Sequence, residues 1–292
     1  MTAAGARRLA VVGWPVEHSL SPALHGAVAR ELGLDWDYGR SAVEPGGLPA
    51  FVGALGPEWL GLSVTAPHKD AAAELADELD PLARATGTVN TLLLGAPIRG
   101  RRALRGWSTD VGGIVRAFAD AGLDRARSAA ILGAGATAQT ALVALASMGV
   151  ERVTVALRTP AKAQRLRELS ASLGVALEVQ ALDAPLPVVD VAVSTLPAAA
   201  SAVPTFAAPP TRLLDADYAR PEGSRYLASL PRLHVIDGRE MLLGQAVLQA
   251  RIFAQGDVDA PLPDEPRVVA AMRGALGASA TGPRASGTLE ES

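Results

Sequence analysis

The most specific chemical pattern in the sequence is a Gly-x-Gly-x-x-Ala run, formed by Gly133, Ala134, Gly135, Ala136, Thr137 and Ala138. A strand-like apolar run at 129–132 precedes it, and a helix-compatible run follows as far as Gly149. In this context the first glycine permits a tight turn, the second lets the backbone approach a pyrophosphate, and Ala138 keeps helix and strand close. Free amides at the helix start bind negative charge. The pattern predicts a dinucleotide site, with an ordinary loop as the alternative.

The end of the next strand, at 152–157, indicates which dinucleotide is bound. An NAD site places an acidic residue there to bind the ribose hydroxyl, whereas an NADP site places arginine near the 2′-phosphate. Here Arg158 follows the strand and Lys162 lies about one helical turn later. Two cations suit a phosphate dianion, so the sequence predicts NADP(H) rather than NAD. Thr159 and Pro160 would equally suit an ordinary helix start, which is the alternative interpretation.

Two further residues could move a proton. Reduction of a carbonyl by hydride leaves negative charge on oxygen, which a nearby acid must neutralise. Lys69 lies just past a predicted strand at 60–65, at the edge where open parallel sheets bind ligands. Asp110 starts a predicted helix at 110–121, and together the two residues would form a coupled acid–base pair. Separately, each has an ordinary role, as a solvated lysine or as a first-turn acid with Thr109 as the cap.

Alternating strands and helices must position these residues, which predicts an α/β fold with parallel sheets. We expect two domains. An N-terminal α/β substrate domain with a mainly parallel sheet would comprise residues 1–107, with C-terminal helices at 239–276 packing back on it. A Rossmann-like NADP-binding domain would comprise 108–238. The Gly-, Ala- and Ser-rich tail at 277–292 is expected to be disordered.

Composition excludes several classes of function. The chain has 292 residues, of which 20% are charged and 49% hydrophobic, with a formal net charge of −3 and no cysteine. The charge argues against a nucleic-acid partner, and the four histidines show no metal-ligand spacing, so we expect no metal site. The uncharged run at 128–150 is interpreted as a strand, loop and helix rather than a membrane span. With no secretory signal, these features predict a cytoplasmic enzyme acting on a small molecule, as a monomer or homodimer.

Six short motifs, taken in order along the chain, identify a family. They are His-Ser-Leu-Ser-Pro at 18–22, Ser-Val-Thr-Ala-Pro-His-Lys at 63–69, Val-Asn-Thr at 89–91, Gly-Trp-Ser-Thr-Asp at 106–110, Gly-Ala-Gly-Ala-Thr-Ala at 133–138 and Met-Leu-Leu-Gly-Gln-Ala at 241–246. Through them the chain resembles the shikimate dehydrogenases over nearly its whole length, and Gly-Pro-Glu-Trp at 56–59 is similar to actinobacterial members. The resemblance implies reversible NADPH-dependent reduction of 3-dehydroshikimate to shikimate.

The resemblance also implies a role for each matching residue. Lys69 and Asp110 match the catalytic pair, and Asp110 also contacts substrate. Ser19 and Ser21 match the residues that hold the substrate carboxylate, and the further substrate contacts are Thr65, Asn90 and Gln245. On the cofactor side, Arg158, Thr159 and Lys162 match the 2′-phosphate clamp. Tyr218 and Gly238 match positions that line the nicotinamide pocket, and Thr195 is a further expected cofactor contact. His68, where the family often has an aromatic residue, is expected at the surface.

Three departures from the family pattern leave the substrate and cofactor preference open. Ser63 and Ser108 stand where the family usually has Asn, and Leu157 replaces the Asn before the clamp arginine. Two alternatives follow. One is a quinate or aminoshikimate dehydrogenase with relaxed cofactor use. The other is a non-catalytic NADP-binding regulator, which the presence of both Lys69 and Asp110 disfavours.

Overall fold

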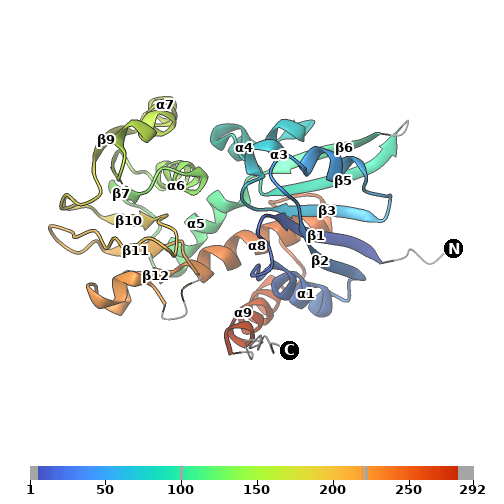
Figure 1. Ribbon diagram of the computed structural model, residues 1–292. Coiled ribbons are helices and arrows are strands. Elements are labelled where there is room, and N and C mark those ends of the chain that lie inside the picture. The colour runs from blue at the N-terminus through green and yellow to red at the C-terminus, as the bar shows by residue number, and fades with distance from the viewer. Residues whose placement is uncertain (1–5, 99–100, 219, 221–222, 282–292) are drawn as a thin grey trace, which may run out of the picture.

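Two α/β lobes are joined by two long helices, α5 (Thr109–Asp120) and α8 (Gly238–Gln255), which run between them in Figure 1. The computed structural model describes residues 6–98, 101–218, 220 and 223–281. This arrangement confirms the predicted two-domain α/β fold. The domain boundaries expected near 107 and 238 fall beside the first residues of α5 and α8. No helix within the described ranges is long and apolar enough to cross a membrane.

The first lobe contains a mixed sheet with the strand order β2-β1-β3-β5-β6-β4. Its strands are β1 (Arg7–Gly13), β2 (Trp36–Ala42), β3 (Trp59–Val64), β4 (Glu78–Leu79), β5 (Thr91–Ile98) and β6 (Arg101–Trp107). Its helices are α1 (Ser21–Leu32), α2 (Leu48–Gly53), α3 (Lys69–Leu75) and α4 (Pro81–Thr86). The pairs β1–β2, β1–β3 and β4–β6 are parallel, whereas β3–β5 and β5–β6 are antiparallel. The sheet is therefore mainly parallel, as predicted.

Strand β6 was not predicted, because its arginines are atypical of a strand. The structure gives two of these arginines partners. The Arg102 guanidinium donates hydrogen bonds to backbone carbonyls, including those of Gly56 and Trp59 at 2.8 and 2.7 Å. The Arg105 guanidinium lies 4.8 Å from the centroid of the Trp107 ring. Their long stems can therefore cover apolar surface while the charged ends remain satisfied.

The second lobe contains a fully parallel sheet with the strand order β12-β11-β10-β7-β8-β9. Its strands are β7 (Ser128–Leu132), β8 (Arg152–Leu157), β9 (Ala176–Ala181), β10 (Val191–Ser194), β11 (Arg212–Asp215) and β12 (Val235–Asp237). Its helical segments are α6 (Ala136–Ser147), η1 (Pro160–Ala163), α7 (Gln164–Leu173), η2 (Arg225–Ala228) and η3 (Arg232–His234). The strand order reverses between β7 and β10, and ligands bind at the carboxyl edge of such a switch point.

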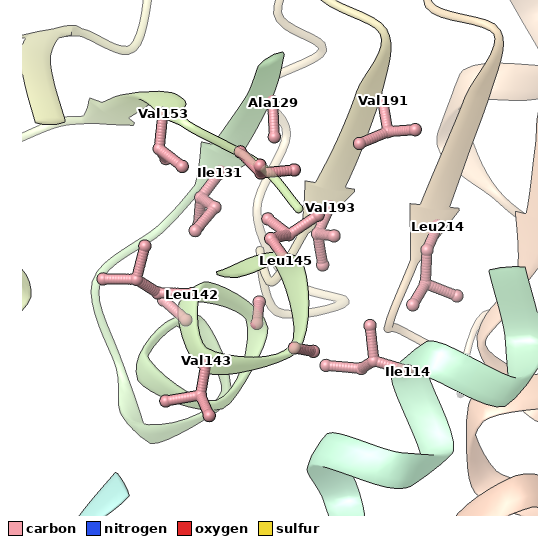
Figure 2. Close-up of a cluster of buried hydrophobic side chains, with 14 of the residues drawn as sticks. Ile114, Ala129, Ile131, Leu142, Val143, Leu145, Val153, Val191, Val193 and Leu214 are labelled. Carbon is pink, nitrogen blue, oxygen red and sulfur yellow. The ribbon is translucent and has the colours of Figure 1, made fainter. Parts of the chain in front are cut away.

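One core explains why α5 is fixed to the second lobe. Figure 2 shows Ile131 and Val193 of the sheet beside Leu145 of α6 and Ile114 of α5. All four side chains are buried. Burying an apolar side chain of this size stabilises the folded state by about 1.5–3 kcal/mol. Helix α5 is thus part of the second lobe's core, although its first turn faces the first lobe.

The C-terminal helices pack on the first lobe, as predicted. Buried Leu24 and Val28 of α1 belong to one cluster with Val247 of α8 and Met272 of α9 (Glu265–Thr281), and α9 lies beside α1 in Figure 1. The prediction that the chain is disordered from 277 was wrong for 277–281, because α9 continues through these residues beyond the buried Leu276. Residues 282–292 lie outside the described part of the chain.

The position of α9 depends on Glu265. Its carboxylate accepts two 2.7 Å hydrogen bonds from Arg251 of α8 and lies 3.4 Å from Arg116 of α5. Burial tends to raise the pKa of Glu265, but the Arg251 hydrogen bonds and the backbone amide of Leu262 hold it below its usual 4.5. A depressed folded-state pKa stabilises the protein above pH 4.5. That stabilisation is lost as the pH falls through the folded-state value.

We expect Glu265→Gln to lower the free energy of unfolding at pH 7 by about 1–3 kcal/mol, because charged hydrogen bonds are lost. Urea unfolding at several pH values should show the difference from wild type narrowing in acid. Glu31→Gln is the matched control. It removes the exposed ion pair with Arg267 and should cost less than about 1 kcal/mol. An equal effect of the two substitutions at pH 7 would contradict the assignment.

Candidate active site

The two lobes enclose a cavity of about 820 Å³. It is lined from the first lobe, from α5 and α8, and from the loops after β10 and β11. The predicted site residues that line it are Ser19, Ser21, Thr65, Lys69, Asn90, Asp110, Thr137, Thr195, Tyr218, Gly238 and Gln245. The predicted residues that do not line it are Gly133, Ala134, Gly135, Ala136, Ala138, Arg158, Thr159 and Lys162.

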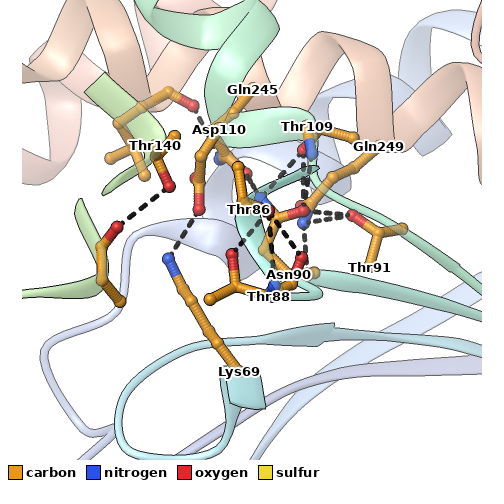
Figure 3. Close-up of polar contacts among 12 residues, drawn as sticks. Lys69, Thr86, Thr88, Asn90, Thr91, Thr109, Asp110, Thr140, Gln245 and Gln249 are labelled. Carbon is orange, nitrogen blue, oxygen red and sulfur yellow. Dashed lines mark hydrogen bonds and ion pairs between the residues drawn. The ribbon is translucent and has the colours of Figure 1, made fainter. Parts of the chain in front are cut away.

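Lys69 and Asp110 form an ion pair in this cavity. The Lys69 Nζ donates to Asp110 Oδ2 at 2.6 Å, and the side chains are only 20% and 10% exposed. Figure 3 shows the two side chains pointing at each other from α3 and α5. Asp110 lies in the first turn of α5, where the helix dipole favours a carboxylate. Low exposure strengthens the pair, because less water screens the charges.

Tyr218 faces this charged region. Its side chain is half-buried, and burial raises the pKa of its phenol, with the negative charges of Asp110 and Asp217 adding to the effect. The phenol is therefore held in its neutral, hydrogen-bonding form. A neutral phenol can donate a hydrogen bond to a polar ligand near the ion pair. This agrees with the ligand contact that the family resemblance implies for Tyr218.

Asn90 links the substrate side of the cavity to α5. Its Oδ1 accepts from the Thr109 backbone amide at 2.9 Å, and its Nδ2 donates to Gln245 Oε1 at 3.3 Å (Figure 3). Thr109 Oγ1 also lies 2.9 Å from Asn90 Nδ2. Thr109 was predicted as the helix cap, but the N-cap is Ser108, and the Thr109 hydroxyl instead contacts Asn90. This contact fixes the residue next to Asp110.

The two serines of the first motif lie together at the start of α1. The Ser19 and Ser21 hydroxyls are 3.2 Å apart, and Arg40 donates to the Ser19 carbonyl at 2.7 Å. The N-cap of α1 is Leu20, which makes no side-chain capping hydrogen bond, whereas Ser19 Oγ accepts from the Ser21 backbone amide at 3.3 Å. The Ser21 hydroxyl therefore does not cap the helix. The hydroxyls can bind a ligand instead.

The nucleotide motif has the backbone geometry that its glycines predict. Gly133 has a φ of +117°, and a Cβ there would collide with Thr195 Oγ1, which donates to the Leu132 carbonyl at 2.9 Å. Helix α6 begins directly after Gly135. No side chain among the described residues caps it. A helix end of this kind can accept an anion at its free amides.

The clamp residues Arg158, Thr159 and Lys162 lie outside the central cavity, after the carboxyl end of β8. All three are exposed. Arg158 lines a separate cavity of about 480 Å³ with Leu182 and Val203. Thr159 makes no capping hydrogen bond to η1, contrary to its ordinary interpretation. The charges of Arg158 and Lys162 remain accessible to a ligand along the sheet edge.

The prediction that His68 is at the surface was wrong. His68 is 2% exposed, and its Nε2 lies 2.7 Å from the Val43 carbonyl. Burial of the ring is tolerated because a polar atom of the backbone satisfies it. The adjacent Lys69 side chain reaches Asp110.

Sequence reasoning missed Arg225, which joins two loops that line the cavity. Its guanidinium donates to the carbonyls of Leu196 and Pro197 at 3.2 and 2.9 Å and to Asp217 at 3.3 Å. The side chain is 2% exposed. No periodicity or motif indicates a buried arginine at this position, because its partners are mostly backbone carbonyls.

Comparison with known proteins identifies the family. The family model for the shikimate dehydrogenase substrate binding domain matches residues 11–92, and the model for shikimate / quinate 5-dehydrogenase matches 119–206. The NADP(+) shikimate dehydrogenase of Methylobacterium radiotolerans is 39% identical over 254 residues, 82% of this chain and 88% of the relative. The chain belongs to the shikimate dehydrogenase family.

Solved structures of shikimate dehydrogenases match the fold. That from Mycobacterium tuberculosis has 36% identity and a TM-score of 0.75, covering 93% of this chain and 99% of the other. The enzyme from Thermus thermophilus, solved in complex with NADP(H) and shikimate, has 30% identity and a TM-score of 0.74, covering 92% and 100%. These findings confirm the family resemblance that the six motifs indicated.

Gly133→Ala and Gly135→Ala should separate stability from nucleotide binding. Gly133→Ala should lower the free energy of unfolding by about 1–3 kcal/mol, because the positive φ and Thr195 both oppose a side chain. Gly135→Ala meets no atom within 4 Å and should leave stability unchanged. It should still raise the Kd for NADPH at least about tenfold, because the methyl group stands where a pyrophosphate approaches. Thermal unfolding and NADPH fluorescence titration measure both effects. If Gly135→Ala binds NADPH as tightly as wild type, the motif is an ordinary loop and not a pyrophosphate site.

Proposed function

We propose that the protein catalyses the reversible NADPH-dependent reduction of 3-dehydroshikimate to shikimate, in the shikimate pathway of aromatic amino acid biosynthesis. The observation that carries this proposal is the 2.6 Å Lys69–Asp110 pair in a cavity lined by hydroxyl and amide side chains. Membership of the family supports it, since the Methylobacterium radiotolerans relative is an NADP(+) enzyme and the Thermus thermophilus enzyme was solved with NADP(H) and shikimate.

The substrate side of the cavity suits a polyhydroxylated carboxylic acid. The paired hydroxyls of Ser19 and Ser21 would bind the carboxylate, and Thr65, Asn90 and Gln245 would bind ring oxygens. Several of these groups are buried, so a substrate lacking the matching hydroxyl would leave them unpaired. Such a site discriminates strongly between related ring acids.

The nucleotide lobe fits NADP(H). The Gly133–Ala138 turn and the α6 terminus would hold the pyrophosphate, with Arg158, Thr159 and Lys162 at the adenosine 2′-phosphate. Within the described residues, the side chains of Arg158 and Lys162 have no hydrogen bond or ion pair, so both cations can neutralise a phosphate. Thr195, Tyr218 and Gly238 would lie at the nicotinamide end. Bound NADPH supplies the hydride.

The Lys69–Asp110 pair would exchange the proton that accompanies hydride transfer. In reduction the pair protonates the developing alkoxide, and in oxidation it receives the hydroxyl proton. Asp110 holds the Lys69 Nζ in place with a charge-assisted hydrogen bond. We further infer that the enzyme is cytoplasmic, in keeping with a cysteine-free chain, and that it acts as a monomer or homodimer without nucleic-acid or membrane partners.

The function is tested by following nicotinamide absorbance with shikimate and quinate, each with NADP and with NAD. A dominant shikimate–NADP rate is expected. If the rate with quinate or with NAD is the highest instead, the specificity has changed, and Ser63, Ser108 or Leu157 would be the residues responsible. If the folded protein binds NADP but turns over neither substrate, the alternative of a non-catalytic NADP-binding regulator would be favoured.

Lys69→Ala should reduce kcat by about 10²–10⁴-fold, the usual contribution of a positioned acid–base group. The KM for NADP should change little, because the phosphate-binding residues lie in the other lobe. The converse variant, Lys162→Ala, should raise the KM for NADP and leave kcat nearly unchanged. Steady-state kinetics with each substrate varied in turn measures both. A kcat within about tenfold of wild type, or about 1.4 kcal/mol in the barrier, would show that Lys69 is not the acid.

A further inference from the structure

The side-chain amide of Gln249 lies in the wall on the substrate side of the cavity, and both of its polar atoms are committed to four polar partners. Gln249 lies one helical turn after Gln245 on α8 and is 2% exposed. Its Nε2 donates to the Asn90 carbonyl at 2.9 Å and to Thr91 Oγ1 at 3.0 Å. Its Oε1 accepts from Ser63 Oγ at 2.8 Å and lies 3.2 Å from His25 Nε2.

The direction of these hydrogen bonds follows from the Asn90 carbonyl. A carbonyl only accepts, so the atom of Gln249 that faces it is the amide nitrogen. The amide oxygen therefore faces Ser63 and His25, and His25 Nε2 must carry a proton. Burial lowers the pKa of His25 to about 4, so the ring is neutral at pH 7 and donates from this nitrogen alone.

A directed chain of hydrogen bonds results. The Tyr38 hydroxyl donates to Ser63 Oγ at 2.6 Å, and Ser63 donates to Gln249. Gln249 donates to Thr91 Oγ1, which donates to Asn90 Oδ1 at 3.0 Å. Burial raises the pKa of Tyr38, so its phenol remains a donor. Figure 3 shows Gln249 and Thr91 on the side of Asn90 away from Lys69.

The chain controls two residues that line the cavity. It holds Asn90 by both its backbone carbonyl and its side-chain oxygen, so that Nδ2 is left facing Gln245. It also commits the Ser63 hydroxyl proton to Gln249, so that Ser63 presents no donor to the cavity. Ser63, one of the departures noted above, is thus hydrogen-bonded to the Gln249 amide of α8.

We propose that Gln249 is a positioning residue that sets the affinity and selectivity for the ring acid by orienting Asn90 and Ser63. This inference rests on the proposed function. Gln249 acts through its neighbours, and it reaches neither the Lys69–Asp110 pair nor the nucleotide motif. Its loss should therefore raise the KM for shikimate by a larger factor than it lowers kcat, because Asn90 also contacts Thr109 next to Asp110. The KM for NADP should stay almost unchanged.

The test compares Gln249→Met with Gln249→Glu. Methionine keeps the length and burial but removes all four hydrogen bonds, and we expect the KM for shikimate to rise about tenfold, or about 1.4 kcal/mol. A glutamate carboxylate still accepts from Ser63 and His25 but cannot donate to Asn90 or Thr91. It should raise this KM at least as much as methionine does. Thr91→Val breaks the chain at another buried position and should act in the same direction.

Phe253→Leu is the matched packing control. Phe253 lies one turn further along α8, with its ring centroid 5.6 Å from that of His25, and takes no part in the hydrogen-bond chain. Its replacement should lower the melting temperature without changing the KM for shikimate. A KM for shikimate within twofold of wild type in Gln249→Met or Thr91→Val, or near wild type in Gln249→Glu, would overturn the inference. Wild-type protein that turns over no shikimate would instead overturn the proposed function.

Discussion

Removing an ion pair from water is costly unless the partners meet in good geometry and are held there. Lys69 and Asp110 meet this condition because their helices are fixed by different cores. Helix α3 packs in the first lobe, whereas Ile114 anchors α5 in the second. Asn90 then fastens the first turn of α5 to the strand edge through Thr109. The charged pair thus depends on contacts that cross from one lobe's sheet to a helix of the other lobe's core.

The polar residues around the pair show why the substrate side of the cavity need not be apolar. Asn90, Thr91, Ser63 and Gln249 are all buried, yet each has hydrogen-bond partners. A buried polar network of this kind is stable only when its members are satisfied together. The same requirement fixes the orientation of each amide. Affinity for a hydroxylated ring and rigidity of the cavity wall therefore have one physical origin.

Much of this architecture could be predicted from local sequence. The strand, turn and helix around Gly133 require particular backbone angles, and regular alternation of strands and helices predicts two α/β lobes. Features that depend on distant partners could not be predicted. In strand β6, one arginine donates hydrogen bonds to backbone carbonyls and another stacks over an aromatic ring. His68 can be buried because its ring lies within hydrogen-bond distance of the Val43 carbonyl. Gln249 and Arg225 carry no local signal, since their partners come from other elements.

The packing of α9 on α1 has a consequence for the order in which the protein can form during synthesis. The second lobe is continuous in sequence and can complete its sheet as soon as β12 has been made. The first lobe buries Leu24 and Val28 against Val247 and Met272, which the ribosome adds long after α1. Its helix α1 must wait, with an uncovered apolar face, while most of the chain is translated. A chaperone that recognises exposed apolar helices would therefore meet this protein first at its N-terminal end.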